Sequence, residues 1–378
     1  MRVRRLFWAI LVTAGVLLLG FIVWIVSLPP PTTADPQPPI AQAETKELLA
    51  ALRPPKRGRP VVAIIGINQS TETTDYLMPY GILRRADVAD VFLIATQAGP
   101  VTLYPALSVV PDATTAEFDA RYPEGADYVI VPAMEPNDDP SALQWLNAQA
   151  SKGATVIGVC AGATVVAAAG LLDGKKATTH WYYLEGMLER HPTITYVANR
   201  RMVVDGNVAT TTGISASMPA SLTLIEAIAG RSTAQSVARE IGLQDWNLRH
   251  DSNAFSFTQP FATTALFNAL AVWNHDEWAI ELQPGMDEVS MALVADAWSR
   301  TYRSRVLTYA AGGEPVESMN GLRVLPDRNS VDHLRRIEPS GFGKQKPADV
   351  MVQNLEQIAA LYGDDTAQLV AMQLEYPW

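Results

Sequence analysis

From residue 59 onward, short apolar runs alternate with stretches in which apolar residues recur at helical spacing. The runs are rich in β-branched residues and almost continuous, as expected of strands buried on both faces. They lie at 61–67, 88–96, 128–133 and 155–160. The helical stretches lie at 75–86, 140–153 and 222–230. This alternation predicts an α/β fold with a doubly wound, mostly parallel sheet that has helices on both faces.

The first 28 residues have a different pattern, because positions 6–28 are apolar and carry no charge. At 1.5 Å per residue this stretch can cross a hydrocarbon core of ~30 Å, and it is longer than the ~7–15 residues of a signal-peptide core. Arg2, Arg4 and Arg5 precede it, which favours a cytoplasmic N-terminus. We therefore expect 1–28 to be a cytoplasmic tip and retained transmembrane helix. The protein would be single-pass in the cytoplasmic (inner) membrane, with its soluble domain outside, in the periplasm.

Three further segments follow. Residues 29–59 are rich in proline and predict a semi-rigid spacer, in which 43–53 can form two or three helical turns. The α/β domain is expected at 60–230 and a C-terminal region at 231–378. Within that region, 306–327 matches 91–112 at a constant offset of 215 positions. The match predicts a degenerate second α/β lobe that partly repeats the first, with chance similarity as the alternative.

Composition narrows the range of possible functions and binding sites. The chain has 378 residues, 48% of them hydrophobic, which supports a folded core over most of its length. Its net charge of -10 disfavours a broad nucleic-acid interface, so we expect no nucleic-acid partner. Cys160 is the single cysteine and there are five histidines, so a Cys-rich zinc site is excluded. No metal or organic cofactor is expected, and Cys160 is either a buried filler or a reactive group.

The residues around Cys160 favour a reactive group. Gly158-Val159-Cys160-Ala161-Gly162 follows an apolar strand and precedes a helix of small residues, which is the pattern of a nucleophile elbow. Such a turn holds the central residue in a strained conformation with its side chain exposed. The helix that begins at Ala161 is expected to favour the thiolate, lowering the thiol pKa below ~8.5, and to offer N–H groups to an oxyanion.

Residues 158–181 and 203–230 closely resemble the ThiJ/PfpI superfamily, whose flavodoxin-like fold is similar to that of class I glutamine amidotransferases. The resemblance covers about 60–230. It is strongest to the amidotransferase-like domains of AraC-type regulators and to isonitrile hydratases. In this family an acidic residue four positions before a proline in the first helix reaches the thiol. The resemblance therefore implies that Asp75, four positions before Pro79, is the acid/base partner of Cys160. A helix N-cap is the alternative.

The resemblance also implies a histidine and a pocket near the thiol. His180 follows Cys160 at the spacing the family shares, so it is expected to orient the thiol or shuttle a proton, with a structural histidine as the alternative. The pocket would be formed by Ala161, Ala133, Met134 and Trp181. Ala133-Met134 replaces the glycine pair with which the family completes its oxyanion pocket, and this puts strong acyl transfer in doubt.

Two functions follow from the sequence. The first is a membrane-anchored, cysteine-dependent hydratase (lyase) or hydrolase acting on a small electrophile, such as an isonitrile, a reactive aldehyde or an amide. The second is a non-catalytic domain that binds a small molecule or senses redox state through Cys160. The expected partners are a small-molecule substrate or ligand, the membrane through 6–28, and a second copy of the chain, since homodimers are usual in families of this kind.

Overall fold

The computed structural model describes residues 2–331, 335–337 and 345–378, with the side chains of 2–7, 9–11 and 336–337 left out. Its centre is a sheet with the strand order β11-β12-β8-β7-β1-β3-β6. All neighbours in it are parallel except β11 and β12. The strands are β1 (Val61–Gly66), β3 (Asp90–Ala95), β6 (Ala113–Thr114), β7 (Tyr128–Val131), β8 (Thr155–Gly158), β11 (Met202–Asp205) and β12 (Val208–Thr211). The four strands predicted from apolar runs are β1, β3, β7 and β8, so those predictions are confirmed.

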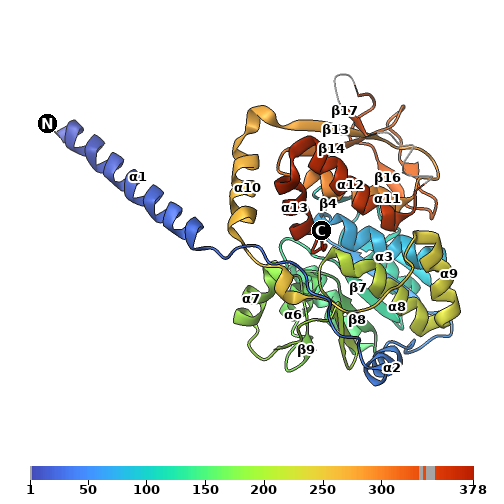
Figure 1. Ribbon diagram of the computed structural model, residues 1–378. Helices are drawn as coiled ribbons and strands as arrows, with labels where there is room; N and C mark the ends of the chain where they lie inside the picture. Colours follow the sequence, from blue (N-terminus) through green and yellow to red (C-terminus); the bar gives the residue numbers. More distant parts are fainter. Residues whose placement is uncertain (1, 332–334, 338–344) are drawn as a thin grey trace.

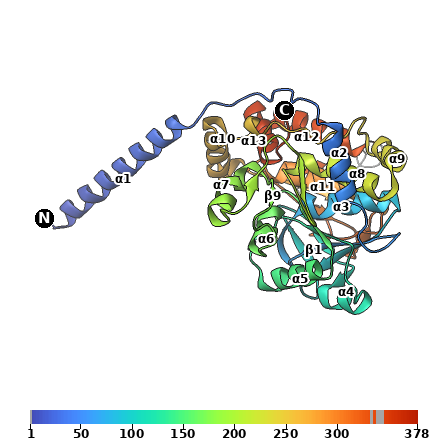
Figure 2. The same ribbon diagram turned by 90° about the horizontal axis from the view of Figure 1, so that it is seen from below.

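Helices cover both faces of this sheet (Figure 2). Along β1, Val62 and Ile64 contribute to one core cluster, whereas Ala63 and Ile65 contribute to the other. The cluster on the first face includes α3 (Thr73–Ala86), α8 (Ser217–Ala229) and α9 (Arg231–Ile241), together with α11 (Glu288–Ser299), which packs on α3. The second carries α4 (Thr115–Arg121), α5 (Pro140–Ser151), α6 (Gly162–Ala168) and α7 (Trp181–Arg190). The predicted doubly wound α/β fold is therefore confirmed for this part of the chain.

Residues after 230 pack directly on this core. Strand β16 pairs antiparallel with β5 in a second sheet of order β15-β16-β5-β4-β2, and β13 lies between β14 and β17 in a third. Helix α12 packs beside α11, and α13 packs on α12 and α10 (Figure 1). The boundary at 230/231 stays a prediction. The remaining elements are β2 (Gln69–Glu72), β4 (Val101–Tyr104), β5 (Ser108–Val110), β9 (Lys176–Ala177), β10 (Thr195–Tyr196), β13 (Asp276–Glu281), β14 (Ser304–Tyr309), β15 (Val316–Glu317), β16 (Arg323–Leu325), β17 (Arg335–Ile337), α10 (Gln259–Leu270), α12 (Pro347–Tyr362), α13 (Asp364–Gln373) and the 3-10 turns η1 (Ile214–Ala216), η2 (Ser252–Ala254) and η3 (Val272–Asn274).

The N-terminal segment forms α1 (Arg2–Ser27), which projects from the body in both views (Figures 1 and 2). Within the described part of the chain, no helix is at once long enough and apolar enough to span a bilayer. The predicted transmembrane anchor, the single-pass inner-membrane location with a periplasmic domain, and the membrane partner are therefore wrong. The three arginines behind the predicted orientation lie outside the described side chains.

The proline-rich segment is not a free spacer. Its predicted helical turns form α2 (Gln42–Ala51), and Leu52 after them is fully buried. The Tyr128 hydroxyl donates to the Leu52 carbonyl at 2.7 Å, and Arg57 forms an ion pair with the buried Asp127 at 2.6 Å. The segment packs on the body because a buried carboxylate such as that of Asp127 needs a cation and N–H donors.

Candidate functional site

Cys160 lies in the turn that joins β8 to α6, with the left-handed backbone angle φ 55°. For a residue other than glycine this conformation costs about 1–2 kcal/mol and persists only where neighbours hold it. The Cys160 N–H donates to Thr211 Oγ1 at 3.1 Å, and Thr179 Oγ1 donates to the Cys160 carbonyl at 3.0 Å. Strand β12 and the segment before α7 thus fix the turn from two sides. The strained backbone expected of the elbow is present, but the exposed side chain expected with it is not, because Cys160 is buried.

Gly162 is required at the start of α6 by close packing. A Cβ atom built on Gly162 would lie 1.9 Å from the Val131 carbonyl oxygen at the end of β7. Only a residue without a side chain lets α6 begin this close to the neighbouring strand. The second glycine of the motif therefore sets the position of the helix that follows the thiol.

The Cys160 thiol is almost completely buried, with 6% of the residue exposed. Burial raises the pKa of the thiol well above its usual value, and the carboxyl groups of Asp75, Glu72 and Glu375 act in the same direction. The Ala161 N–H opposes this shift but does not cancel it. The lowered thiol pKa expected from the helix start is therefore wrong, because loss of hydration outweighs the attraction of a short helix. At neutral pH the site holds a thiol.

Asp75 lies in the first turn of α3 and is fully buried. Its Oδ2 accepts the Ala133 N–H at 3.1 Å, while Oδ1 has no hydrogen-bond partner among the described residues. Burial, followed by the charge of Glu72, raises the pKa of Asp75 well above its usual value, so this carboxyl keeps its proton to a higher pH than an exposed aspartate does. The alternative reading of Asp75 as the helix cap is wrong, because Glu72 caps α3 by accepting the Asp75 N–H at 2.6 Å. Asp75 Oδ1 is thus a buried polar atom that takes part in no hydrogen bond among the described residues.

In the loop after β7, the backbone groups of Ala133 are already hydrogen-bonded and do not form an open oxyanion pocket. The Ala133 N–H is taken by Asp75, and the Ala133 carbonyl accepts the Glu72 N–H at 2.9 Å. Met134 is 6% exposed and packs in the core on the second face of the sheet. The Ala161 N–H donates to the Cys160 sulfur and opposes the rise of its pKa. The pocket roles of Ala161, Ala133 and Met134 stay predictions, and Ala133 has no free N–H to offer.

His180 and Trp181 contact the C-terminal helix. His180 Nδ1 accepts the Tyr182 N–H at 3.2 Å, which leaves the ring proton on Nε2 to donate to the Gln373 carbonyl at 3.0 Å. Burial lowers the pKa of His180, so the ring is neutral. Trp181 Nε1 donates to the Met372 carbonyl at 2.8 Å. Both side chains hold the end of α13 in place, and their roles in orienting the thiol and lining the pocket stay predictions.

A buried charge cluster next to Asp75 was missed by the sequence analysis. Arg300 donates to Glu72 Oε1 and to Asp296 Oδ1, each at 2.7 Å. Burial raises the pKa of Asp296 to about 8. A signal for Arg300 was available, because it occupies the same place in its half of the 215-residue repeat as Arg85 does in the first half.

Glu375 is a second residue that the sequence did not reveal. It follows α13, accepts the Gly213 N–H, and contacts His250 Nε2 at 3.0 Å. Both members of the Glu375–His250 pair are almost fully buried. No motif marks Glu375, since its position near the thiol depends on how the C-terminal segment packs. Among the described residues, no group of three or more His, Cys, Asp or Glu side chains is arranged to hold a metal ion.

The raised pKa of the Cys160 thiol makes a direct prediction for chemical labelling. The rate of alkylation by iodoacetamide in the native protein should rise with pH through a midpoint above ~8.5, the value of a free cysteine. Protein unfolded in urea is the reference, and its midpoint should lie at the free value. A native midpoint at or below that of the unfolded chain would show that a charge effect overcomes burial.

Comparison with known proteins agrees with this geometry. The sequence model of the DJ-1/PfpI family matches residues 61–227. Isonitrile hydratase from Pseudomonas putida is 34% identical over 44% of this chain and 72% of its own length. The HTH-type transcriptional regulator CdhR from Pseudomonas aeruginosa is 30% identical over 44% of this chain, which spans about half (48%) of the regulator.

Solved structures of the same superfamily are also similar. Drosophila melanogaster DJ-1beta matches 49% of this chain and 98% of its own, with a TM-score of 0.44 and 23% identity. An AraC family transcriptional regulator from Pseudomonas putida matches 48% and 98%, with a TM-score of 0.43 and 19% identity. Since the isonitrile hydratase is matched over most of its length and the family pattern spans the main sheet and the elbow, the chain belongs to the DJ-1/PfpI family.

Proposed function

We propose that the protein hydrates a small isonitrile, with Cys160 as the nucleophile and Asp75 as the general acid/base. The observation that carries this proposal is the buried Asp75 carboxyl, whose raised pKa favours the protonated form and whose Oδ1 has no partner among the described residues. The similarity to an isonitrile hydratase supports the choice of substrate.

In this mechanism the resting site holds two protons, one on Cys160 and one on Asp75, and the reaction uses both. Asp75 gives its proton to the terminal isonitrile carbon while the sulfur bonds to the same carbon, and the thiol proton moves to the Asp75 carboxylate. The product of this step is a thioimidate, R–N=CH–S–Cys. Water then adds to its carbon, the C–S bond breaks with return of a proton to sulfur, and the N-substituted formamide R–NH–CHO leaves. The sum is one isonitrile plus one water.

An isonitrile suits this site better than an amide or an aldehyde. Attack on a carbonyl group develops negative charge on oxygen, which needs preorganised N–H donors. The Ala133 N–H is already bonded to Asp75. Addition to an isonitrile instead needs a proton delivered to carbon, which the neutral Asp75 supplies. The Ala161 N–H acts on the sulfur and would stabilise it as the C–S bond breaks.

The remaining predicted residues take supporting roles in this proposal. Met134 and the side chain of Ala133 lie at the loop that holds Asp75, so they would fix the acid. His180 and Trp181 bind α13 and would keep the C-terminal segment closed over the thiol.

The test is a turnover assay with simple alkyl and aryl isonitriles, in which the formamide is measured by mass spectrometry. The wild type should release formamide over many turnovers. Asp75→Asn keeps the shape and can still accept the Ala133 N–H, but it has no acidic proton. We expect it to lower kcat by about 10²–10⁴-fold. Formamide release by Asp75→Asn at the wild-type rate, or none from the wild type, would contradict the proposal.

A binding or sensing role is the second candidate, and the raised pKa of the thiol favours binding over redox sensing. Peroxides react with thiolates, so a buried thiol with a raised pKa oxidises slowly at neutral pH. If the wild type binds isonitriles or small amides in calorimetry without releasing product, the binding role replaces the enzymatic one.

A further inference from the structure

Two segments of the chain repeat each other in hydrogen bonding as well as in sequence. In one, Val101 pairs with Val109 between β4 and β5. At an offset of 215, Val316 pairs with Val324 between β15 and β16. The Leu93 N–H donates to Asp112 Oδ2 at 2.8 Å, and the Thr308 N–H donates to Asp327 Oδ2 at 2.7 Å, again at that offset. Equal contacts at equal spacing indicate a true duplication.

The repeat extends to the helices before these strands. Helix α3 is capped by Glu72, which accepts the Asp75 N–H, and α11 is capped by Asp287, which accepts the Ser290 N–H. Both caps and both donors are 215 positions apart. Asp87 after α3 and Tyr302 after α11, also at that offset, share a left-handed backbone with φ 49° and 55°. The parallel pair β1–β3 has its counterpart in β13–β14.

The two copies face each other as the subunits of a symmetric dimer do. Where β5 pairs antiparallel with β16, Val109 lies opposite its own counterpart, Val324. Arg300 pairs with Glu72 at 2.7 Å, and the equivalent Arg85 pairs with Asp287 at 2.5 Å. Reciprocal contacts of this kind are the mark of an interface with two-fold symmetry.

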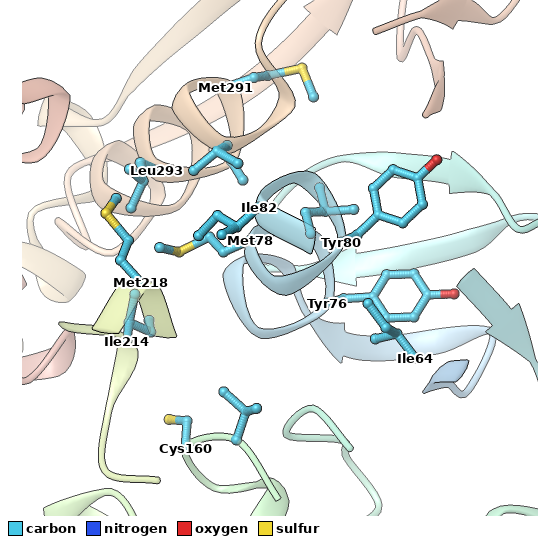
Figure 3. Close-up of a cluster of buried hydrophobic side chains, with 14 of the residues drawn as sticks. Ile64, Tyr76, Met78, Tyr80, Ile82, Cys160, Ile214, Met218, Met291 and Leu293 are labelled. Carbon is cyan, nitrogen blue, oxygen red and sulfur yellow. The ribbon is translucent and has the colours of Figure 1, made fainter. Parts of the chain in front are cut away.

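The helices of the two copies are in close contact along this interface. Figure 3 shows Met78 and Ile82 of α3 turned toward Leu293 of α11, and all three belong to one buried cluster. A Cβ on Gly81 would come within 2.5 Å of Glu288 Oε1, so the glycine permits the approach of α11.

We infer that residues 276–327 are a degenerate internal copy of 61–112 that occupies the place of a second subunit, and that this copy supplies Arg300 as a positioning residue for the Cys160 site. The role assigned to Arg300 rests on the proposed function, whereas the internal pseudo-dimer does not. The homodimer expected from the sequence is in this view replaced by contacts within one chain, at least on this surface.

The two copies are equal in packing but not in chemistry. Arg300 donates a hydrogen bond to Glu72, and Glu72 accepts the Asp75 N–H. The carboxyl group of Asp75 in turn affects the pKa of the thiol. The reciprocal Arg85–Asp287 pair supports α11, whose residue equivalent to Asp75 is Ser290. The chain has no cysteine besides Cys160, so the second copy has no nucleophile. A single chain thus keeps one reactive site and one supporting lobe.

Arg300→Met and Arg85→Met form a matched pair that tests the positioning role, because each breaks one of two equivalent ion pairs. Loss of the Arg300 cation should raise the midpoint of the thiol alkylation profile by about one pH unit, and Arg300→Lys should restore part of the shift. Arg85→Met should leave the midpoint unchanged. Equal midpoints in the two methionine variants would overturn the role of Arg300 even if wild-type Cys160 is fully active.

The pseudo-dimer has its own test, independent of catalysis. In a Cys160→Ala background, Val109→Cys together with Val324→Cys should form a disulfide within one chain on oxidation, because directly opposed residues of an antiparallel pair have Cα atoms about 4.5–5.5 Å apart, a separation that a disulfide can bridge. Val109→Cys alone should stay monomeric on a non-reducing gel. A Val109→Cys disulfide between two chains, or no bond within the chain in the double variant, would contradict the internal copy.

Discussion

Cys160→Ala should abolish formamide production, with kcat falling by about four orders of magnitude or more, to the level of buffer. The effect is this large because the sulfur forms the covalent bond on which the proposed reaction depends, and no second cysteine exists to replace it. The measurement is the same mass-spectrometric assay, at isonitrile concentrations that saturate the wild type.

Thr164→Val is the matched control for this loss. The Thr164 hydroxyl donates to the Ala161 carbonyl at 2.7 Å, so its removal disturbs the elbow without touching the thiol. It should cost about 1–2 kcal/mol of stability and leave kcat within about threefold. Retained turnover in Cys160→Ala, or equal losses in the two variants, would show that the elbow serves only as a structural turn.

Gly162→Ala should cause the largest loss of stability among single-atom additions near the site. The new methyl group would lie 1.9 Å from the Val131 oxygen, and both partners are backbone groups at the ends of buried elements. Because neither can move away cheaply, the free energy of unfolding should fall by about 3 kcal/mol or more, measured as a lower midpoint in urea.

The control is Gly186→Ala in α7, where the nearest neighbour of an added methyl group is the end of the Arg190 side chain at 4.0 Å. This change should be neutral or stabilise the protein by up to about 1 kcal/mol, because alanine favours a helix. Equal midpoints for Gly162→Ala and the wild type would mean that α6 does not begin against β7.

The raised pKa values of Asp75 and Cys160 give the two candidate functions opposite pH behaviour. An acid with a raised pKa keeps its proton to a higher pH than an exposed aspartate, so hydration should fall only as the pH rises through that raised pKa and Asp75 loses its proton. Oxidative sensing through a thiolate should instead become faster as pH rises. The sign of the pH dependence therefore separates catalysis from redox sensing.

Local pattern was enough to locate the framework of the site. The runs that became β1, β7 and β8 are apolar on both faces, and the helical stretches became α3 and α5. The glycines around Cys160 predict a tight turn. The physical reason is that only glycine tolerates the close contact that α6 makes with β7. Position 75 was found through a family motif and not through physics, because an aspartate at a helix start is more often a cap.

The charge state of the thiol and the environment of the N-terminal helix could not be derived from local sequence pattern. The N-terminal stretch was interpreted as a membrane anchor from its length, its lack of charge and the arginines before it, yet within the described residues no helix has the properties of a span. The thiol was expected to be acidic, yet its pKa is raised. The second error came from judging the helix start without the burial of the thiol beside it.

The sequence by itself determined the order of the elements, the elbow and the identity of the nucleophile candidate, since these depend on neighbours a few residues apart. The tertiary structure alone decided that the pKa of Asp75 is raised, that its carboxyl accepts the Ala133 N–H, and that Arg300 reaches Glu72 across 228 positions of chain. The physical reason is that desolvation and Coulomb forces act through space. They depend on which distant segments pack around a group. The repeat at an offset of 215 residues affects the site only in the folded chain, where its two halves face each other.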